Sequence, residues 1–312
     1  MTSPRRIHLA DSLECWPTLR LADWKDTCAT LHMWTQIVGK IRLELTPLVN
    51  HWWNVPLYVS SCGLTTSIIP YGNRSFEMEF DFHADKLVIR TSDPKTASVA
   101  LAPRSVADFY REVMSVLRSL DIEVKIWTMP AEVPDAIPFD QDTVHASYDA
   151  ESVRQLWRIL LSVDDVFKVF RSRFVGKSSP VHFFWGSFDL AITRFSGRRA
   201  PERTDWPAGL AKIMREAYSH EVISAGWWPG SGEITDAAFY CYAAPAPQGF
   251  ADQKVRPPQA FYHSGVGDYV LMYDDVRRAK SPNAALLEFL ESTYEAGATT
   301  GNWDRKALEA AV

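Results

Sequence analysis

"SPVHFFWGSFDLAITRFSG", Ser179 to Gly197, reads as two β-strands joined by a short turn. Aromatic and β-branched residues fill both arms, and Gly186 with Ser187 stands between them, as in a β-hairpin. A helix with one apolar face is predicted just before the hairpin, over residues 149–170. The order helix, proline, aromatic strand pair is therefore the unit from which the fold is predicted.

The same unit occurs earlier in the chain. Residues 26–45 have helical spacing of apolar residues, and "NHWWNVPLYVSSCGLTTSIIPYG" follows them. Pro56 matches Pro180, and Ile68 matches Ile192, at the same separation along the chain. Internal similarity at a long period indicates a duplicated segment.

Short alternating stretches follow each hairpin and predict strands. They are "SFEMEFDF", "KLVIRT" and "ASVALA" in the first half, and "SHEVISAGWW", "AAFYCYAAP", "AFYHSG" and "YVLMYD" in the second. Helical patterns at residues 104–120 and 281–297 close the two halves. We therefore predict an α+β fold, an internally duplicated unit of helix, antiparallel β-meander and helix, whose two sheets could share one cavity.

A proline-rich segment, residues 130–142, separates the two halves. Residues 1–135 are predicted to form the first helix–meander–helix repeat, and residues 136–312 the second repeat, with longer loops. The boundary is expected to lack regular structure because three prolines interrupt it.

Composition excludes several classes of protein. The 312 residues carry a formal charge of −5, so nucleic acid, which needs a clustered basic surface, is not an expected partner. The four cysteines show no metal-binding or disulfide spacing, and no apolar run reaches the roughly 18 residues of a membrane span. We expect a cytoplasmic protein that does not bind membranes. Twelve tryptophans indicate an aromatic-walled cavity or thick cores.

Several long stretches carry a resemblance, among them "LHMWTQIVGK", "NHWWNVPLYV", "SPVHFFWGSFDLAITRFSGRRAP" and "YSHEVISAGWWPG". Together they resemble a bacterial family described as a domain of unknown function. The resemblance runs from about Trp16 to Trp303, nearly the whole chain. It implies a cytoplasmic bacterial protein and brings no assigned activity.

Four polar residues are the candidates for catalysis: His182, Asp189, His220 and Glu221. A hairpin turn at Gly186 would bring His182 and Asp189 to nearly opposed positions, and "SHEV" would form another strand of that sheet. Two imidazoles and a carboxylate can bind a divalent metal ion, which makes His182, His220 and Asp189 the candidate ligands. The alternative is a histidine packed in an aromatic core and an aspartate satisfied by a turn or by an arginine.

A second set of residues is predicted to bind a ligand, with aromatic walls and a few polar groups that fix its orientation. Adjacent tryptophans point to opposite faces of a strand, so each "WW" doublet must serve two surfaces. Packing between sheets would give the same pattern. The candidates are His51, Trp52, Trp185, Arg194, Trp227, Trp228 and Tyr240.

The sequence therefore predicts a small-molecule enzyme or binding protein with an aromatic-lined pocket. Its chemistry would be metal-assisted or general acid/base, with a divalent metal ion as the possible cofactor. The alternative is a noncatalytic scaffold or homo-oligomer whose surplus aromatic residues form an interface.

Overall fold

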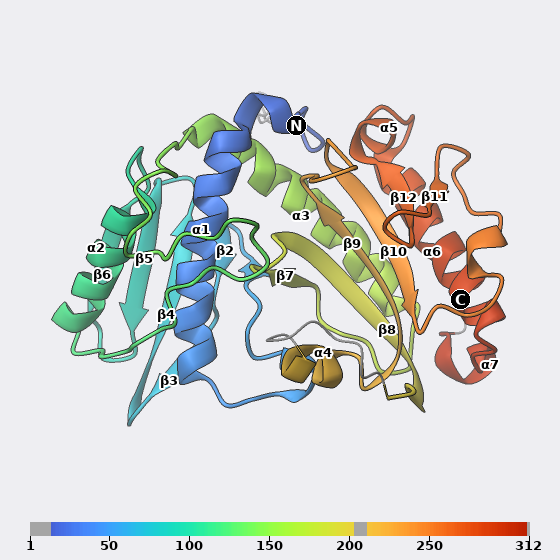
Figure 1. Ribbon diagram of the computed structural model, residues 1–312, viewed down its shortest axis with the longest axis horizontal. Helices are drawn as coiled ribbons and strands as arrows, with labels where there is room; N and C mark the ends of the chain where they lie inside the picture. The colour runs from blue at the N-terminus through green and yellow to red at the C-terminus, as the bar shows by residue number, and fades with distance from the viewer. Residues whose placement is uncertain (1–13, 203–210, 311–312) are drawn as a thin grey trace, which may run out of the picture.

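The computed structural model describes residues 14–202 and 211–310, which form an α+β fold with two antiparallel sheets of six strands each (Figure 1). The first half contains α1 (Leu21–Leu45), η1 (Asn50–Trp52), β1 (Tyr58–Val59), β2 (Gly63–Thr65), β3 (Ile69–Tyr71), β4 (Arg74–Asp81), β5 (Lys86–Thr91), β6 (Thr96–Ala100) and α2 (Val106–Ser119). The predicted strands and both predicted helices of this half are confirmed.

The second half begins with a long helix and continues through the second sheet. Its elements are α3 (Ala150–Ser172), β7 (His182–Phe184), β8 (Asp189–Arg199), α4 (Ala211–Ala217), β9 (His220–Trp228), β10 (Ala238–Ala244), η2 (Phe250–Asp252), β11 (Phe261–His263), β12 (Asp268–Met272), α5 (Tyr273–Arg277), α6 (Pro282–Thr300) and α7 (Arg305–Leu308). Residues 120–149 connect the halves without a helix or strand, as their prolines predict.

The two sheets follow the same plan. The first has the order β1-β2-β4-β5-β6, with β3 on one end of β4, and the second has the order β7-β8-β9-β10-β12-β11. A long helix precedes each sheet, and another helix follows its last long strand. This correspondence agrees with the expected repeat, while descent of the halves from one duplicated segment stays a prediction.

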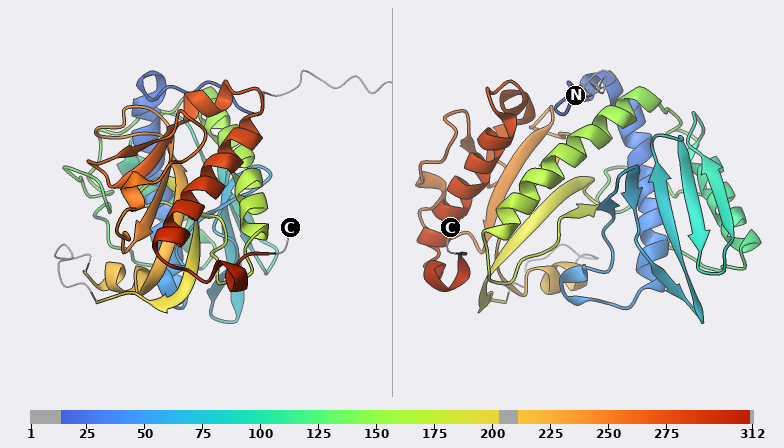
Figure 2. Two further views of the ribbon diagram at one scale, coloured as in Figure 1. Left: turned by 90° about the vertical axis from the view of Figure 1, so that its right-hand side faces the viewer. Right: turned by 180° about the vertical axis from the view of Figure 1, so that it is seen from behind.

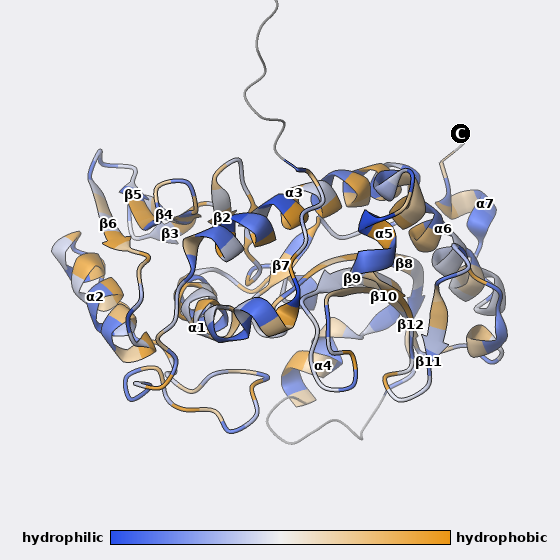
Figure 3. Ribbon diagram, turned by 90° about the horizontal axis from the view of Figure 1, so that it is seen from above, coloured by the Kyte–Doolittle hydropathy of each residue, from blue (hydrophilic) through white to orange (hydrophobic). Residues whose placement is uncertain are grey.

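Helices cover one face of each sheet. α1 and α2 contact each other and the first sheet, whereas α3 and α6 contact each other and the second sheet (Figures 1 and 2). Seen from above, α4 lies on the opposite side of the second sheet from α3 and α6 (Figure 3). We call this side of the second sheet its front face and the side under α3 and α6 its back face.

The two halves join at the hairpin that decided the prediction. Leu57, just before β1, and Phe183 on β7 exchange two backbone hydrogen bonds of 2.9 Å. Trp185 follows β7, and its indole Nε1 donates to the backbone oxygen of Val55 at 2.8 Å. Its ring lies against α1 at Gly39, where a Cβ would stand 2.2 Å from Nε1. Glycine at position 39 is therefore required for α1 to approach the hairpin.

None of the helices in the described residues is long and apolar enough to cross a membrane.

Substitution of Gly39 tests this junction. Gly39→Ala should lower the free energy of unfolding by about 1–3 kcal/mol, because overpacking against Trp185 outweighs the helix propensity of alanine. Urea unfolding followed by circular dichroism would measure the change. Gly39→Ala combined with Trp185→Phe should lose less than the sum of the two single changes, since the smaller ring makes room for the methyl group. A Gly39→Ala protein as stable as the parent would contradict this account.

Candidate functional site

The front face of the second sheet carries small residues at its centre and polar residues around them. Ala191 on β8 pairs with Gly226 on β9, and Gly226 pairs with Tyr240 on β10. In the next row, Thr193 pairs with Ser224, and their hydroxyl oxygens lie 2.9 Å apart. Residues paired across antiparallel strands point to the same face, so these side chains form one surface.

Asp189 is the buried acid of this surface. Its side chain accepts hydrogen bonds from the hydroxyl groups of Ser187 and Tyr240, and the residue is 6% exposed. No basic side chain forms an ion pair with it in the described residues. Burial raises the pKa of the Asp189 carboxyl, and the two hydrogen bonds, which act in the other direction, do not offset this. Asp189 therefore holds its proton more tightly than an exposed aspartate does.

Tyr240 reaches Asp189 by crossing β9 at Gly226. A Cβ at position 226 would lie 2.3 Å from the Tyr240 hydroxyl oxygen, so only glycine leaves the ring its path. Two residues along the same strand, Tyr242 lies with its ring nearly parallel to that of Tyr240, at 12° and 6.1 Å between centroids. The hydroxyl oxygens of Tyr242 and Tyr218 are 2.9 Å apart. The carboxyl group thus lies at one end of a band of tyrosines.

A polar stripe on α1 brings the connection between the halves to this surface. His32, Gln36 and Lys40 follow one another at intervals of four residues and so share a face of the helix. Gln36 exchanges two hydrogen bonds with the backbone of Ala131, at 2.8 and 2.9 Å. Lys40 donates to the oxygen of Met129 at 2.6 Å. These contacts fix the segment that contains the next residue, Glu132.

Glu132 lies beside the turn of the β7–β8 hairpin. A Cβ at Gly186 would be 2.6 Å from its Oε1, so glycine at the turn makes room for this carboxyl group. The backbone of Glu132 has a left-handed φ of 55°, a strained conformation for a side chain of this type. The residue is exposed, yet partial burial of its carboxyl and, after it, the charge of Asp189 raise its pKa. Two carboxyl groups from distant segments therefore lie close enough to influence each other.

A family model covers nearly the whole chain. The family is described as a family of unknown function, DUF5996, and its model matches residues 16–310. The chain belongs to this family. No curated protein and no solved structure matches it. The expected full-length membership of an uncharacterised family is confirmed, while the bacterial origin stays a prediction.

In this DUF5996 protein the predicted metal ligands are not brought together. The hairpin register places Asp189 opposite Phe184, and His182 opposite Ala191. The rings of Trp53, Tyr58 and Phe184 surround His182, whereas His220 packs edge-on against His51 at 5.7 Å. Within residues 14–202 and 211–310, no three His, Cys, Asp or Glu side chains are placed to hold a metal ion. The prediction of a metal site at His182, His220 and Asp189 was therefore wrong.

His51 and Glu221 also have defined partners. The Nδ1 of His51 lies 3.2 and 3.3 Å from the oxygens of Glu216 and Ala217, so it donates a hydrogen. Its Nε2 therefore accepts from the Nζ of Lys177, which is 2.6 Å away. Glu221 pairs with Arg198 at 2.6 Å. Because neighbours on a strand point to opposite faces, Glu221 and His220 cannot share a site.

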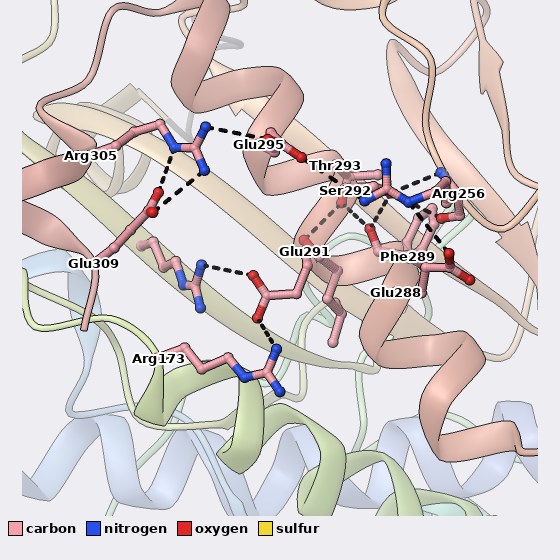
Figure 4. A network of polar contacts seen from close by, with 12 residues as sticks. Arg173, Arg256, Glu288, Phe289, Glu291, Ser292, Thr293, Glu295, Arg305 and Glu309 are labelled. Atoms are coloured by element: carbon pink, nitrogen blue, oxygen red, sulfur yellow. Dashed lines mark hydrogen bonds and ion pairs between the residues drawn. The ribbon is translucent and has the colours of Figure 1, made fainter. Parts of the chain in front are cut away.

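Arg194 and Trp227 lie on the back face, which corrects their predicted place in the ligand site. The Arg194 guanidinium lies 3.4 Å from the Phe170 ring centroid and 4.3 Å from that of Tyr294. Glu291 of α6 is 3.9 Å from Arg194 and 3.4 Å from Arg173 (Figure 4). Burial lowers the pKa of Arg194 to about 10, so it stays charged and binds α3 to α6.

The Trp227–Trp228 doublet divides between the two faces of the second sheet as predicted. Trp228 lies beside Tyr240 on the front face, at 5.3 Å, while Trp227 is fully buried behind it. Trp53, rather than Trp52, contacts both His51 and His182. Trp185 lies in the junction with α1, as described above, and so does not line a cavity.

Sequence reasoning missed Glu132, Tyr242 and Tyr218. Glu132 lies in a proline-rich connection that has no periodic pattern to place it. One signal was present: polar residues recur at positions 32, 36 and 40 of α1, at intervals of four and among buried apolar residues. Such a stripe indicates that a helix face contacts a polar segment rather than the core.

His182 should make the protein sensitive to acid. Both ring nitrogens are buried without a hydrogen-bond partner in the described residues, and burial, then Arg42 and Arg171, lower its pKa to about 3. A pKa below its unfolded value of about 6.5 means that stability is present above pH 6.5 and is lost as the pH falls. At pH 5 this loss should be about 2 kcal/mol.

Replacement of the ring tests this directly. His182→Phe should remove that loss, measured as the difference in unfolding free energy between pH 7.5 and pH 5. His83→Gln, which changes an exposed histidine and leaves His182 in place, should retain it. An unchanged difference in His182→Phe would exclude His182 as the cause.

Proposed function

We propose that this protein is a small-molecule enzyme that uses Asp189 and Glu132 as a general acid/base pair. One observation carries the proposal: two carboxyl groups from separate segments lie near one glycine turn, and neither forms an ion pair with a basic side chain in the described residues. A buried carboxylate that serves only stability is normally paired with a cation, and Asp189 is buried without such a partner in the described residues. An unneutralised pair is typical of sites that move protons.

The environments of the two acids favour different roles. Asp189 is buried, which raises the pKa of its carboxyl group, whereas Glu132 is exposed and can meet a substrate. Coupled carboxyl groups lose their protons in two separate steps, so one can bear a proton while the other is ionised. Glu132 would exchange a proton with the substrate. Asp189, which accepts a hydrogen bond from the Tyr240 hydroxyl group, would balance the change in charge at Glu132.

The aromatic surroundings supply the binding surface of this proposed enzyme. Trp228 and Tyr240 lie together on the front face, and Tyr242 continues the band toward α4. Such rings bind the apolar part of a small molecule, and their polar atoms orient it. The second candidate function, a noncatalytic homo-oligomer, needs these aromatic residues at a subunit interface instead.

Removal of either carboxylate should abolish turnover. Incubation of the protein with a defined mixture of metabolites, followed by mass spectrometry, should reveal a compound that the protein converts. Glu132→Gln and Asp189→Asn should slow this conversion by about 10²–10⁴-fold, because each removes a proton donor or acceptor of nearly the same shape. Asp135→Asn, an exposed acid in the same connection, should convert the compound at the parental rate.

The outcomes separate the two candidate functions. Unchanged conversion by both variants would refute the acid/base pair. Absence of any conversion, together with a stable oligomer in light scattering, would support the noncatalytic alternative.

Gly226 offers a test of position rather than of chemistry. Gly226→Ala should move the Tyr240 hydroxyl group off Asp189, since the new methyl group would occupy its path. We expect conversion to fall and its pH optimum to shift, because Asp189 loses a hydrogen bond that stabilises its charged form. Gly72→Ala, in a surface turn with a left-handed φ of 60° where a Cβ meets no neighbour, is the control for a glycine change that strains the backbone without touching the site. A pH profile identical to that of the parent would contradict this role for Gly226.

A further inference from the structure

The second half contains a cavity of about 720 Å³ beside α4, near the far end of β8 and the start of the segment after β10. This volume lies in the range of small-molecule sites. In the described residues it is lined by Arg199, Ala200, Pro201, Glu202, Arg215, Tyr218, Ser219, Ala244, Pro245 and Ala246. Its walls come from the second half alone, so it is not the cavity expected between the two sheets.

Two arginines of the cavity lack acidic partners. Arg199 and Arg215 form no ion pair within 4 Å in the described residues, although Glu202 also lines the cavity. Their neighbour Arg198 differs: it pairs with Glu221 at 2.6 Å and donates to the backbone oxygens of Gly301 and Asn302. Adjacent side chains on β8 point to opposite faces, so one arginine is neutralised and the other faces the cavity.

Two further basic residues, His220 and Lys177, lie close to Arg199. His220 pairs with Arg199 in the register of β8 and β9, and its Nδ1 lies 3.1 Å from the Ser219 hydroxyl group. Lys177, which donates to His51, lies near enough to His220 to lower its pKa, after burial and together with Arg199. Glu216 is the acid that faces this group. The positive charge of the cavity wall therefore comes from Arg199 and Arg215, and Glu202 is the acidic residue among the described lining residues.

Part of the cavity lining is apolar. Ala244, Pro245 and Ala246 present small aliphatic surfaces to the cavity. Tyr218 lines the cavity and its hydroxyl group lies 2.9 Å from that of Tyr242, whose ring lies beside Tyr240. The cavity is thus linked through three tyrosines to Asp189.

We propose that this cavity binds the oxyanion of a small organic acid, a carboxylate or a phosphate ester with a short apolar body. Two guanidinium groups on the wall of one cavity can each donate charge-assisted hydrogen bonds to such an anion, and the alanine and proline side chains suit the apolar remainder. Such an anion would be the substrate of the proposed acid/base enzyme. Only its conversion, and not its binding, rests on that proposed function. Binding of the anion can be measured without turnover.

Phenyl phosphate, benzoate and benzyl alcohol are matched probes with one ring and different charge. Calorimetric titration of the full chain at low salt should show saturable binding of phenyl phosphate, benzoate or both, and none of neutral benzyl alcohol. Arg199→Gln and Arg215→Gln should each weaken this binding about 10–100-fold, because each removes a charge-assisted hydrogen-bond donor. Binding of only one of the two anions identifies that group as the one recognised.

The control is Arg278→Gln. Arg278 directly follows α5, is exposed and pairs with Asp274 of that helix, so its replacement should leave the affinity unchanged. Both cavity arginines are exposed, so their variants should keep the melting temperature of the parent. Absence of binding, equal binding of benzyl alcohol, or unaltered affinity in both cavity variants would overturn the proposal. Glu132→Gln and Asp189→Asn should retain anion affinity, so loss of turnover in them with intact binding tests the reaction separately.

Discussion

The contact between Trp185 and Gly39 is the constraint on which the rest of the structure depends. It lets α1 lie directly against the β7–β8 hairpin, where the backbones of Leu57 and Phe183 already join the two halves. With the helix at this distance, its polar stripe meets the connection between the halves and fixes it there. A larger residue at position 39 would hold α1 away, and Glu132 would then lose its place beside Gly186.

The electrostatics of the front face depend on which charged residues of β8 point toward it. Asp189 is buried among hydroxyl groups, while the buried arginine of the same strand, Arg194, faces the other side of the sheet. The strand thus separates an acid and a base that would otherwise neutralise each other. One face gains a cation that packs helices together, and the other keeps a carboxyl group with a raised pKa. The alternation of side chains along β8 therefore places Arg194 against the helices and Asp189 on the front face.

Regular elements were predictable because their patterns are local. The helices at residues 26–45 and 149–170 and the successive strands were found from periodicity, turns and prolines, and the structure agrees with them closely. The site was less accessible. Asp189 and Tyr240 were identified, but their contact depends on Gly226, a residue whose importance lies in the absence of a side chain. His182 and His220 were grouped because both were expected on strands of one sheet, yet the register places His182 opposite Ala191 and His220 opposite Arg199. Glu132 depends on tertiary contacts of a segment without any period, so no local pattern could place it.

The exchange of hydrogen bonds between Leu57 and Phe183 also bears on the behaviour of the protein at high concentration. Open strand edges are where β-proteins pair with their own copies and aggregate. Each sheet turns one outer strand, β1 or β7, toward the other half, so these strands shield one another. The outermost strands left at the far ends are β6 and the three-residue β11. The pairing between the halves thereby leaves fewer open strand edges, which disfavours edge-to-edge association of copies.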